Sequence, residues 1–287
     1  MDRVSRRQFT LMAGATLATR ELAQGAQATL TAGEVVNRIK KNLGIPWNGS
    51  TYRDTFKIGG PDSPVKGIAT SFGGNLRVLQ LAQKADLNMV IVHEPTFYSD
   101  ADRLDLVKDD PLYKRKLDWA NRNKIVVWRI HDHWHAHKPD GISTGWNKGM
   151  GWTQYQLEGS LRDFKIPETT LGKLAKYVAQ KLETKSVRVI GDPSTRVSLV
   201  SRGGHNLTQN MDGLRRADCI VVSETREYDS FEYARDTVLS GAAKGAIFIS
   251  HASGEDLGMK EFAEWVKPFV PEVAVQFIPT TDEFWTV

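Results

Sequence analysis

The chain has 287 residues, 40% hydrophobic and 25% charged, which is a globular composition long enough for one large or two medium domains. Its formal net charge is +4, of which the first 28 residues contribute about +2, so about +2 remains on the rest of the chain. Because this charge is small and the chain has no Lys/Arg run, we expect no nucleic-acid partner. The single cysteine, Cys219, excludes an intramolecular disulfide and a cysteine-based zinc site, and its apolar surroundings predict a buried thiol.

The first 28 residues have the features of a twin-arginine (Tat) signal peptide. The pattern Ser5–Leu11 contains the two arginines, a short apolar stretch follows, and Ala26–Ala28 offers small residues for a signal peptidase. A frayed basic helix is the alternative interpretation. We expect export by the Tat pathway, cleavage after Ala28, and a periplasmic or extracellular protein. No segment reaches the ~20 apolar residues that span a membrane, so no membrane span is expected.

The mature chain alternates between predicted strands and helices. A Thr31-x-x-Glu34 capping box opens the first helix, which runs to about Asn42, and a polar loop follows as far as Ser63. Further helices are predicted at 75–84, 109–123, 147–161, 170–183, 228–241 and 254–268. Strands are predicted at 65–70, 88–93, 125–130, 187–190, 196–200, 219–223, 246–250 and 273–279. This alternation predicts an α/β fold with mostly parallel sheets.

Six of the seven histidines follow predicted strands. His93 and Glu94 end one strand, and Pro95 prevents that strand from continuing. His251 ends another, with Glu255 four residues later. The strand at 125–130 leads into His131, His133, His135 and His137. Because imidazoles and carboxylates are the usual ligands of catalytic zinc, iron and manganese, these strand ends predict a metal site. A surface histidine run that binds metal adventitiously is the alternative.

The geometry of the histidine run depends on the backbone after Ile130. In an extended segment all four histidines would share one face, whereas a turn after Ile130 would let only one or two reach a common metal. For the last pair, we expect His251 to end its strand and Gly254 to permit a turn that brings Glu255 alongside.

Glu224 also follows an apolar strand, 219–223. It is interpreted either as an acid on the substrate side of the site or as a solvated loop carboxylate. His205 stands in a glycine loop, and we expect it near the cleft rather than among the ligands.

Five motifs in order resemble the Nif-three-like family of dinuclear-metal proteins, many of which carry the label GTP cyclohydrolase type 2. The resemblance covers about residues 32–287. Ala85–Pro95 is similar to the family's Ala-Asp-Leu-Ile-Ile-x-His-His-Pro motif, and His131–His135 to its His-Thr-Asn-Leu-Asp motif. The remaining matches are Val187–Gly191 with the loop Gly203–Gly204, Ala217–Glu224, and Ser250–Glu255.

The resemblance implies two divalent metal ions, of zinc, iron or manganese, and five ligands: His93, Glu94, His135, His251 and Glu255. Two of these depart from the family pattern, because Glu94 stands in place of a histidine and His135 in place of an aspartate. The two changes are reciprocal and leave the total ligand charge unchanged. We interpret the set as a rearranged dinuclear site rather than a lost one.

The resemblance also implies two intertwined α/β domains with the metal site in the cleft between them, and a toroidal homohexamer. The first domain is expected at 29–137 plus about 245–287, and the second at about 138–244. The stretch between His137 and Val187 leaves little room for the domain that longer family members insert.

The function expected from these features is that of a metal-dependent hydrolase, with Glu224, His131 or His133 as general acid or base. Its substrate would be a small cyclic molecule, amide or phosphoester outside the cytoplasm. GTP is disfavoured as the substrate, because GTP is found in the cytoplasm and the protein is expected to be exported. The alternatives are a metal-binding or scaffold protein without turnover, and an adaptor whose site has decayed.

Overall fold

The computed structural model describes residues 29–224 and 226–280. The expected signal peptide, 1–28, lies outside the described residues. The chain divides into two compact units, Met1–Leu30 and Thr31–Val287, and every element below belongs to the second. Among the described residues, each helix is too short or too polar to traverse a bilayer.

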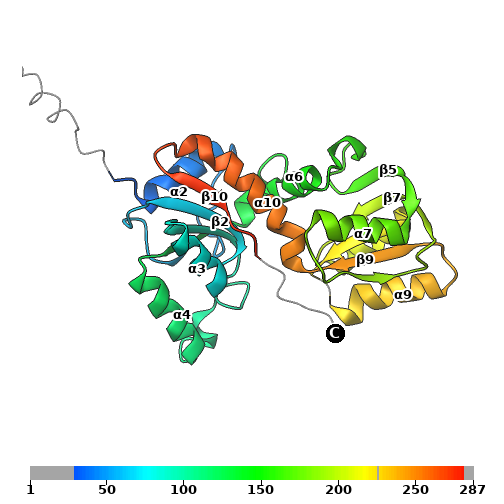
Figure 1. The fold of residues 1–287 in the computed structure, drawn as a ribbon, viewed down its shortest axis with the longest axis horizontal. Helices are drawn as coiled ribbons and strands as arrows, with labels where there is room; N and C mark the ends of the chain where they lie inside the picture. Colours follow the sequence, from blue (N-terminus) through cyan, green and yellow to red (C-terminus); the bar gives the residue numbers. More distant parts are fainter. Residues whose placement is uncertain (1–28, 225, 281–287) are drawn as a thin grey trace, which may run out of the picture. The chain divides into compact units, whose positions relative to one another are not determined.

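The first sheet has five strands in the order β1-β4-β3-β2-β10. Figure 1 labels β2 and β10, which lie side by side. The pairs β10–β2, β2–β3 and β3–β4 are parallel, and β1 is an antiparallel edge strand. Residues 89–93 are buried without interruption, as expected for a parallel strand that is covered on both faces. The strands are β1 (Phe56–Ile58), β2 (Gly67–Gly73), β3 (Met89–Glu94), β4 (Val126–Arg129) and β10 (Ala274–Phe277).

The second sheet also has five strands, in the order β5-β7-β8-β9-β6. Its centre is parallel and both edge strands are antiparallel. Cys219 is fully buried at the start of β8, as predicted, and burial raises the pKa of its thiol. The strands are β5 (Asp163–Thr170), β6 (Arg188–Ile190), β7 (Arg196–Arg202), β8 (Cys219–Ser223) and β9 (Gly245–Ile249). The predicted α/β architecture with mostly parallel sheets is therefore confirmed.

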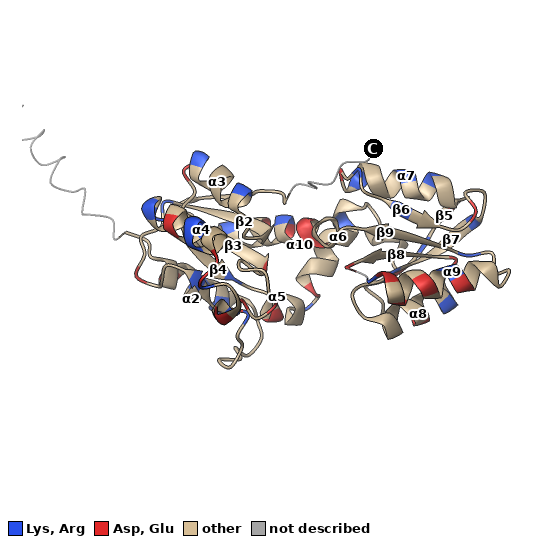
Figure 2. Ribbon diagram, turned by 90° about the horizontal axis from the view of Figure 1, so that it is seen from below, with Lys and Arg blue, Asp and Glu red and all other residues tan. Residues whose placement is uncertain are grey.

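The helices flank these sheets, and on α8 and α9 acidic and basic side chains are interspersed (Figure 2). The predicted capping box at the first helix is present, with Thr31 N–H donating to Glu34 Oε2 over 2.7 Å and Glu34 N–H to Thr31 Oγ1 over 3.2 Å. The α-helices are α2 (Ala32–Asn42), α3 (Leu76–Lys84), α4 (Pro111–Arg122), α5 (Asp132–Ala136), α6 (Gly141–Gly149), α7 (Leu171–Lys181), α8 (Leu207–Arg216), α9 (Glu232–Leu239) and α10 (His251–Val266).

Helix α10 connects the two sheets, because it packs against β2 and β10 of the first, β8 of the second, and α6 (Figure 1). Its crossing with α6 requires glycine at two positions. A Cβ atom on Gly258 would lie 2.6 Å from the Cα atom of Ile142, and one on Gly145 would lie 2.3 Å from the carbonyl oxygen of Leu257. The two helix backbones thus approach closely where α10 carries two of the expected ligands.

Several secondary-structure predictions were wrong or incomplete, and helix α8, for example, was not predicted. Residues 147–161 are not a helix, because α6 ends at Gly149 and Gly151 adopts a φ of +68°. A 3₁₀ turn and strand β5 follow instead. Strand β1 lies inside the predicted polar loop, where it pairs with β4. The division into two domains stays a prediction. Strand β9 falls in the predicted first domain, but it pairs with strands of the second sheet.

Candidate metal centre

Strand β3 delivers His93 and Glu94 to the carboxyl end of the first sheet, as predicted. His93 is fully buried, and its Nδ1 lies 3.0 Å from the carbonyl oxygen of Ile130. Because that carbonyl can only accept, Nδ1 carries the proton and Nε2 is left with a free lone pair. Burial, with smaller contributions from His135 and His131, holds the pKa of His93 well below its usual value. His93 is thus a neutral imidazole whose Nε2 suits a metal.

The chain turns directly after β4 instead of staying extended. The Asp54 carboxylate accepts hydrogen bonds from the backbone N–H groups of His131 (2.6 Å), Asp132 (3.1 Å) and His133 (3.0 Å), and this caps the short helix α5. His131 and His135 therefore lie one turn apart. Their ring centroids are 4.5 and 4.9 Å from that of His93. Of the two geometries open from the sequence, the structure has the turn.

The first turn of α10 supplies His251 and Glu255. Ser250 caps this helix, and its side chain accepts from the N–H of Ser253. His251 Nε2 lies 3.2 Å from Glu255 Oε2, as expected for residues four apart on one helical face. The predicted turn at Gly254 was wrong. Gly254 lies within the helix, where a Cβ atom would meet Ser223 Oγ at 2.6 Å.

The three segments converge on two overlapping groups of possible metal ligands. One contains His93, His131 and His135, the other His93, Glu94 and Glu255, and within each group the ligand atoms lie within 4.8 Å of one another. His93 Nε2 is buried without a hydrogen-bond partner. Glu255 Oε2 lies 3.3 Å from it and is also buried without a hydrogen bond, although it forms an ion pair with His251 Nε2 over 3.2 Å. Buried polar atoms are normally hydrogen-bonded, so an imidazole nitrogen without a partner that faces a buried carboxylate oxygen fits a divalent metal ion.

Charge in the cluster is arranged around Glu255. Burial alone would raise the pKa of Glu255, but the contact with His251 and the charges of the neighbouring histidines outweigh it and hold that pKa well below its usual value. For His251, burial opposes the charged form, but Glu255, Glu224 and Glu94 together raise its pKa to about 9. Without metal, the two residues therefore form an ion pair.

His131, predicted as a catalytic candidate, lies inside the cluster, and His133 lies outside it. The His133 ring is stacked on Trp47 with centroids 3.7 Å apart, its Nδ1 contacts Asp54, and its Nε2 accepts from the N–H of Asn48 over 2.8 Å. Both nitrogens of His133 are thus engaged away from the cluster.

Glu224 and His205 lie at the edge of the cluster. Glu224 Oε2 is 3.5 Å from His251 Nε2 and 3.2 Å from His205 Nδ1. Glu224 has a φ of +52°, a left-handed conformation that is unusual for a residue other than glycine.

Three supporting residues were missed from the sequence: Asp54, Arg129 and Asp140. Asp140 Oδ2 lies 2.9 Å from His135 Nδ1, and Asp140 Oδ1 accepts from the N–H of Ser143 over 2.8 Å at the start of α6. An aspartate just before a helix is a recognisable N-cap, so the sequence around Asp140 could have indicated its role. The sequence around Asp54 or Arg129 gives no such indication, because the residues that they contact are distant in sequence.

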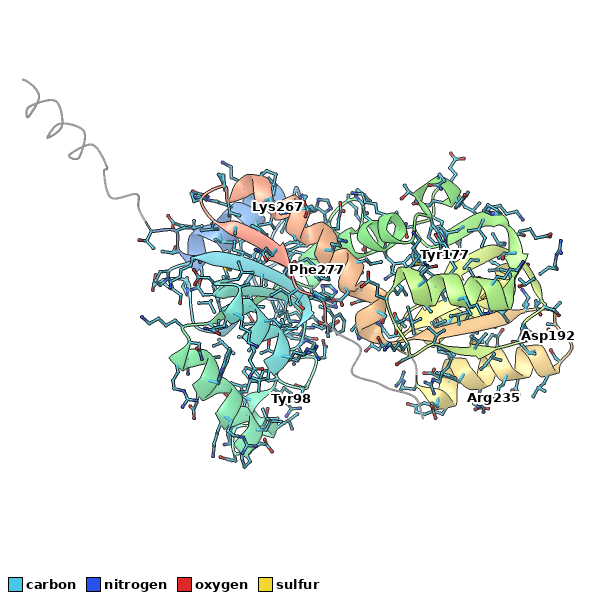
Figure 3. The ribbon with its side chains drawn as sticks, viewed as in Figure 1. Tyr98, Tyr177, Asp192, Arg235, Lys267 and Phe277 are labelled. Atoms are coloured by element: carbon cyan, nitrogen blue, oxygen red, sulfur yellow. The ribbon has the colours of Figure 1, made fainter. Side chains whose placement is uncertain are left out.

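A cavity of about 700 Å³ opens beside the cluster. Glu94, His131 and His251 line it on the side of the cluster. Tyr98, which is labelled in Figure 3 and is 60% exposed, also lines it. A second cavity, of about 480 Å³, is lined by Lys66, Asn88 and Lys124, and no cluster residue lines it. The larger cavity therefore gives the cluster access to a small molecule.

The fold and the cluster define a mixed α/β protein with two five-stranded sheets and a His/Glu site suited to a metal. This chain belongs to the Duf34/NIF3 (NGG1p interacting factor 3) family, whose sequence model matches residues 30–283. The match confirms the resemblance seen in the motifs.

Individual relatives agree with this assignment. A "GTP cyclohydrolase 1 type 2 homolog" of Chlamydia pneumoniae is 26% identical in an alignment of length 245 that covers 79% of this chain and 89% of that protein. Staphylococcus aureus protein SA1388 matches with a TM-score of 0.69 at 16% identity, over 90% of this chain and 99% of its own. A Bacillus cereus protein related to NIF3 matches with a TM-score of 0.69 at 13% identity, over 91% and 100%. The two structures show a shared fold.

Proposed function

We propose that this protein is a metal-dependent hydrolase that holds two divalent ions of zinc, iron or manganese in the cluster. The observation that carries this proposal is His93 Nε2, which is buried without a hydrogen-bond partner and faces Glu255 Oε2 at 3.3 Å, next to an open cavity. A structural metal site is closed by protein ligands, whereas a catalytic site keeps access for substrate. The cavity beside the cluster favours the catalytic interpretation.

His93 belongs to both ligand groups, and its Nε2 would donate to one of the ions. His131, His135, Glu94 and Glu255 are the other members of these groups and would supply further ligands, and His251 lies beside them at 3.2 Å from Glu255 Oε2. Bound there, the ions would lower the pKa of a water molecule and polarise the bond to be cleaved. Asp140 would hold the ring of His135 through Nδ1, as hydrogen-bonded partners of metal-binding histidines commonly do.

Glu224 is the best placed of the three candidate acid–base residues. His131 faces the ligand cluster and His133 is committed to Asp54, whereas Glu224 lines the cavity and is partly exposed. Its Oε2 would take the proton from the attacking water and return it to the leaving group. The contact with His205 Nδ1 would hold that carboxylate in place.

The proposed substrate is a small cyclic amide or a phosphoester. The cavity size suits a small molecule, and its lining offers charge of both signs, including Arg53, Lys116 and Glu224. The twin-arginine pattern at Ser5–Leu11 supports the further proposal that the enzyme acts outside the cytoplasm. A homohexamer, proposed from the family resemblance, is tested by sedimentation.

The test combines metal content with turnover on untagged protein. We expect about two metals per chain by elemental mass spectrometry, lost in His93→Ala and Glu255→Ala. Glu224→Gln is expected to keep its metal and lose most turnover on a panel of amides and phosphoesters. Full metal content without turnover on the panel would favour the non-catalytic metal-binding alternative. Metal retained in both ligand variants would refute the site itself.

A further inference from the structure

Arg129, the last residue of β4, is a buried cation in contact with a candidate ligand. It is fully buried, and its Nη2 donates to Glu94 Oε2 over 2.9 Å. Its Nε donates to the carbonyl oxygen of His93 over 2.8 Å, and its Nη1 donates to the carbonyl oxygen of Asp100. One guanidinium therefore holds both ends of the turn that follows β3.

The two oxygens of Glu94 have different surroundings. Oε2 is the one held by Arg129. Oε1 faces the cluster, 3.4 Å from His131 Nε2 and 3.8 Å from His251 Nε2. Glu94 thus presents one oxygen to the cluster, and the charge of its carboxylate is balanced at the other. Arg129 also lies 3.3 Å from Asp100 and 3.7 Å from Asp102, but Asp100 is paired with Arg53 and Asp102 with Lys57. The Arg129–Glu94 pair therefore offers a single donor atom with no net charge, which is also what a neutral histidine offers.

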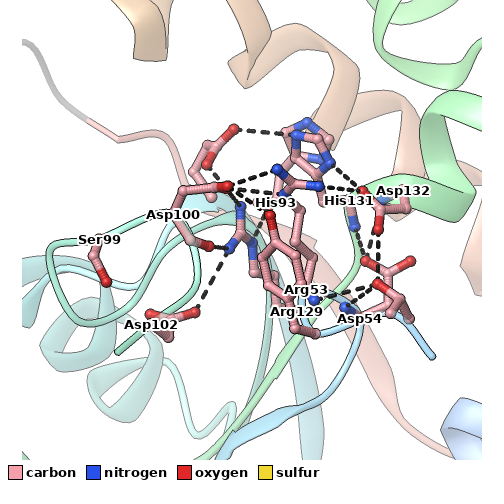
Figure 4. A network of polar contacts seen from close by, with 12 residues as sticks. Arg53, Asp54, His93, Ser99, Asp100, Asp102, Arg129, His131 and Asp132 are labelled. Atoms are coloured by element: carbon pink, nitrogen blue, oxygen red, sulfur yellow. Dashed lines mark hydrogen bonds and ion pairs between the residues drawn. The ribbon is translucent and has the colours of Figure 1, made fainter. Parts of the chain in front are cut away.

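Arg129 is itself held by a chain of charged residues (Figure 4). Its Nη2 lies 3.3 Å from Asp100 Oδ1, and Arg53 holds both oxygens of Asp100, at 2.9 and 2.6 Å. Arg53 also reaches Asp132 over 3.2 Å, and Asp132 lies 3.0 Å from His131 Nδ1. The guanidinium is therefore fixed from several sides, as expected of a group that sets the position of another.

We propose that Arg129 is a positioning residue that makes Glu94 a one-oxygen, charge-balanced donor to the metal site. This inference rests on the proposed metal centre. It explains how a carboxylate takes a place beside His93 without adding net charge to the cluster. The competing account is that Arg129 acts only on the backbone, by holding the carbonyl groups of His93 and Asp100. That role would affect metal binding whether or not Glu94 is present.

The experiment is a double-mutant cycle in metal affinity. Zn²⁺ and Mn²⁺ are titrated calorimetrically into apoprotein of the full chain carrying Arg129→Lys, Glu94→Ala, or both. Lysine keeps the positive charge but lacks the planar fork. We expect Arg129→Lys to weaken metal binding by about 10–100-fold, the usual effect of removing a partner of a ligand. In the Glu94→Ala background the same change is expected to alter affinity by no more than about twofold.

Arg38→Lys is the matched control, because Arg38 also pairs with a carboxylate, Glu272, over 2.8 Å but lines neither the cluster nor its cavity. It is expected to leave metal affinity unchanged. Arg129→Gln replaces the lysine variant if that variant does not fold. An equal loss of affinity in both backgrounds would overturn the positioning role and leave the metal centre standing. Wild-type protein that binds neither ion would overturn the proposed function, and this inference with it.

Discussion

The cluster predicts that metal raises the thermal stability of this protein and that His93→Ala abolishes the effect. A ligand present at 100 times its Kd stabilises a folded protein by about 2.7 kcal/mol. For a large domain, each kcal/mol shifts Tm by about 2–4 °C, so the expected rise is about 5–11 °C. His93 belongs to both ligand groups, so replacing it removes a donor from each. The rise is therefore expected to fall below about 2 °C in His93→Ala.

The assay is thermal unfolding followed by circular dichroism, on apoprotein with and without Zn²⁺ or Mn²⁺. Each variant is compared with its own apoprotein, because removing a buried ring also destabilises the fold. His137→Ala is the control, since His137 contacts the carbonyl oxygen of Pro139 and belongs to neither ligand group. A full metal-induced rise in His93→Ala, or its loss in His137→Ala, would show that the metal binds elsewhere.

Three further predictions concern the scaffold of the site. Asp54→Ala leaves three backbone N–H groups and the ring of His133 without their acceptor. The free energy of unfolding, measured with urea, is expected to fall by about 3 kcal/mol, and a fall below about 1 kcal/mol would contradict the capping role. Burial lowers the pKa of Lys116 from 10.5 to about 8, so between pH 8 and 10.5 this lysine binds more protons in the unfolded chain than in the folded one. The free energy of unfolding of the wild type, relative to that of Lys116→Met, should therefore rise by about 3 kcal/mol over that pH interval. A difference between the two proteins that stays constant from pH 7 to 11 would contradict this prediction. Gly258→Ala is expected to cost about 1–3 kcal/mol through contact with Ile142, whereas Gly60→Ala, where a Cβ meets nothing within 4 Å, should be neutral; equal effects would argue against the tight helix crossing.

The parts of the site that the sequence predicts are those with contiguous signals. An unbroken apolar run followed by His93, Glu94 and Pro95 identifies both a buried strand and its end, and β3 ends at Glu94. The spacing of His251 and Glu255 is likewise local. His251 was expected to end its strand, but β9 ends at Ile249 and His251 is the first residue of α10. The helix begins three residues earlier than expected, because Ser250 provides the cap.

The parts that the sequence could not predict depend on distant partners. Nothing within residues 131–137 indicates that the chain turns, because the carboxylate that caps the turn belongs to Asp54. Strand β1 could not be predicted for the same reason, since its three residues form a strand only by pairing with β4. Arg129 looked like an ordinary strand residue, and only the fold places its guanidinium against Glu94. Local periodicity cannot report such contacts.

The meeting of β3, α5 and α10 at one cluster has a consequence for how the chain is held together. An ion shared by His93 and Glu255 would be a cross-link between residues far apart in sequence. A covalent link that closes a loop of ~100 residues stabilises a protein by about 4.7 kcal/mol through the unfolded chain. Cys219, the single cysteine, has no second thiol in the chain to form such a link. Chelators would then act on this fold as reducing agents act on a disulfide-bonded one.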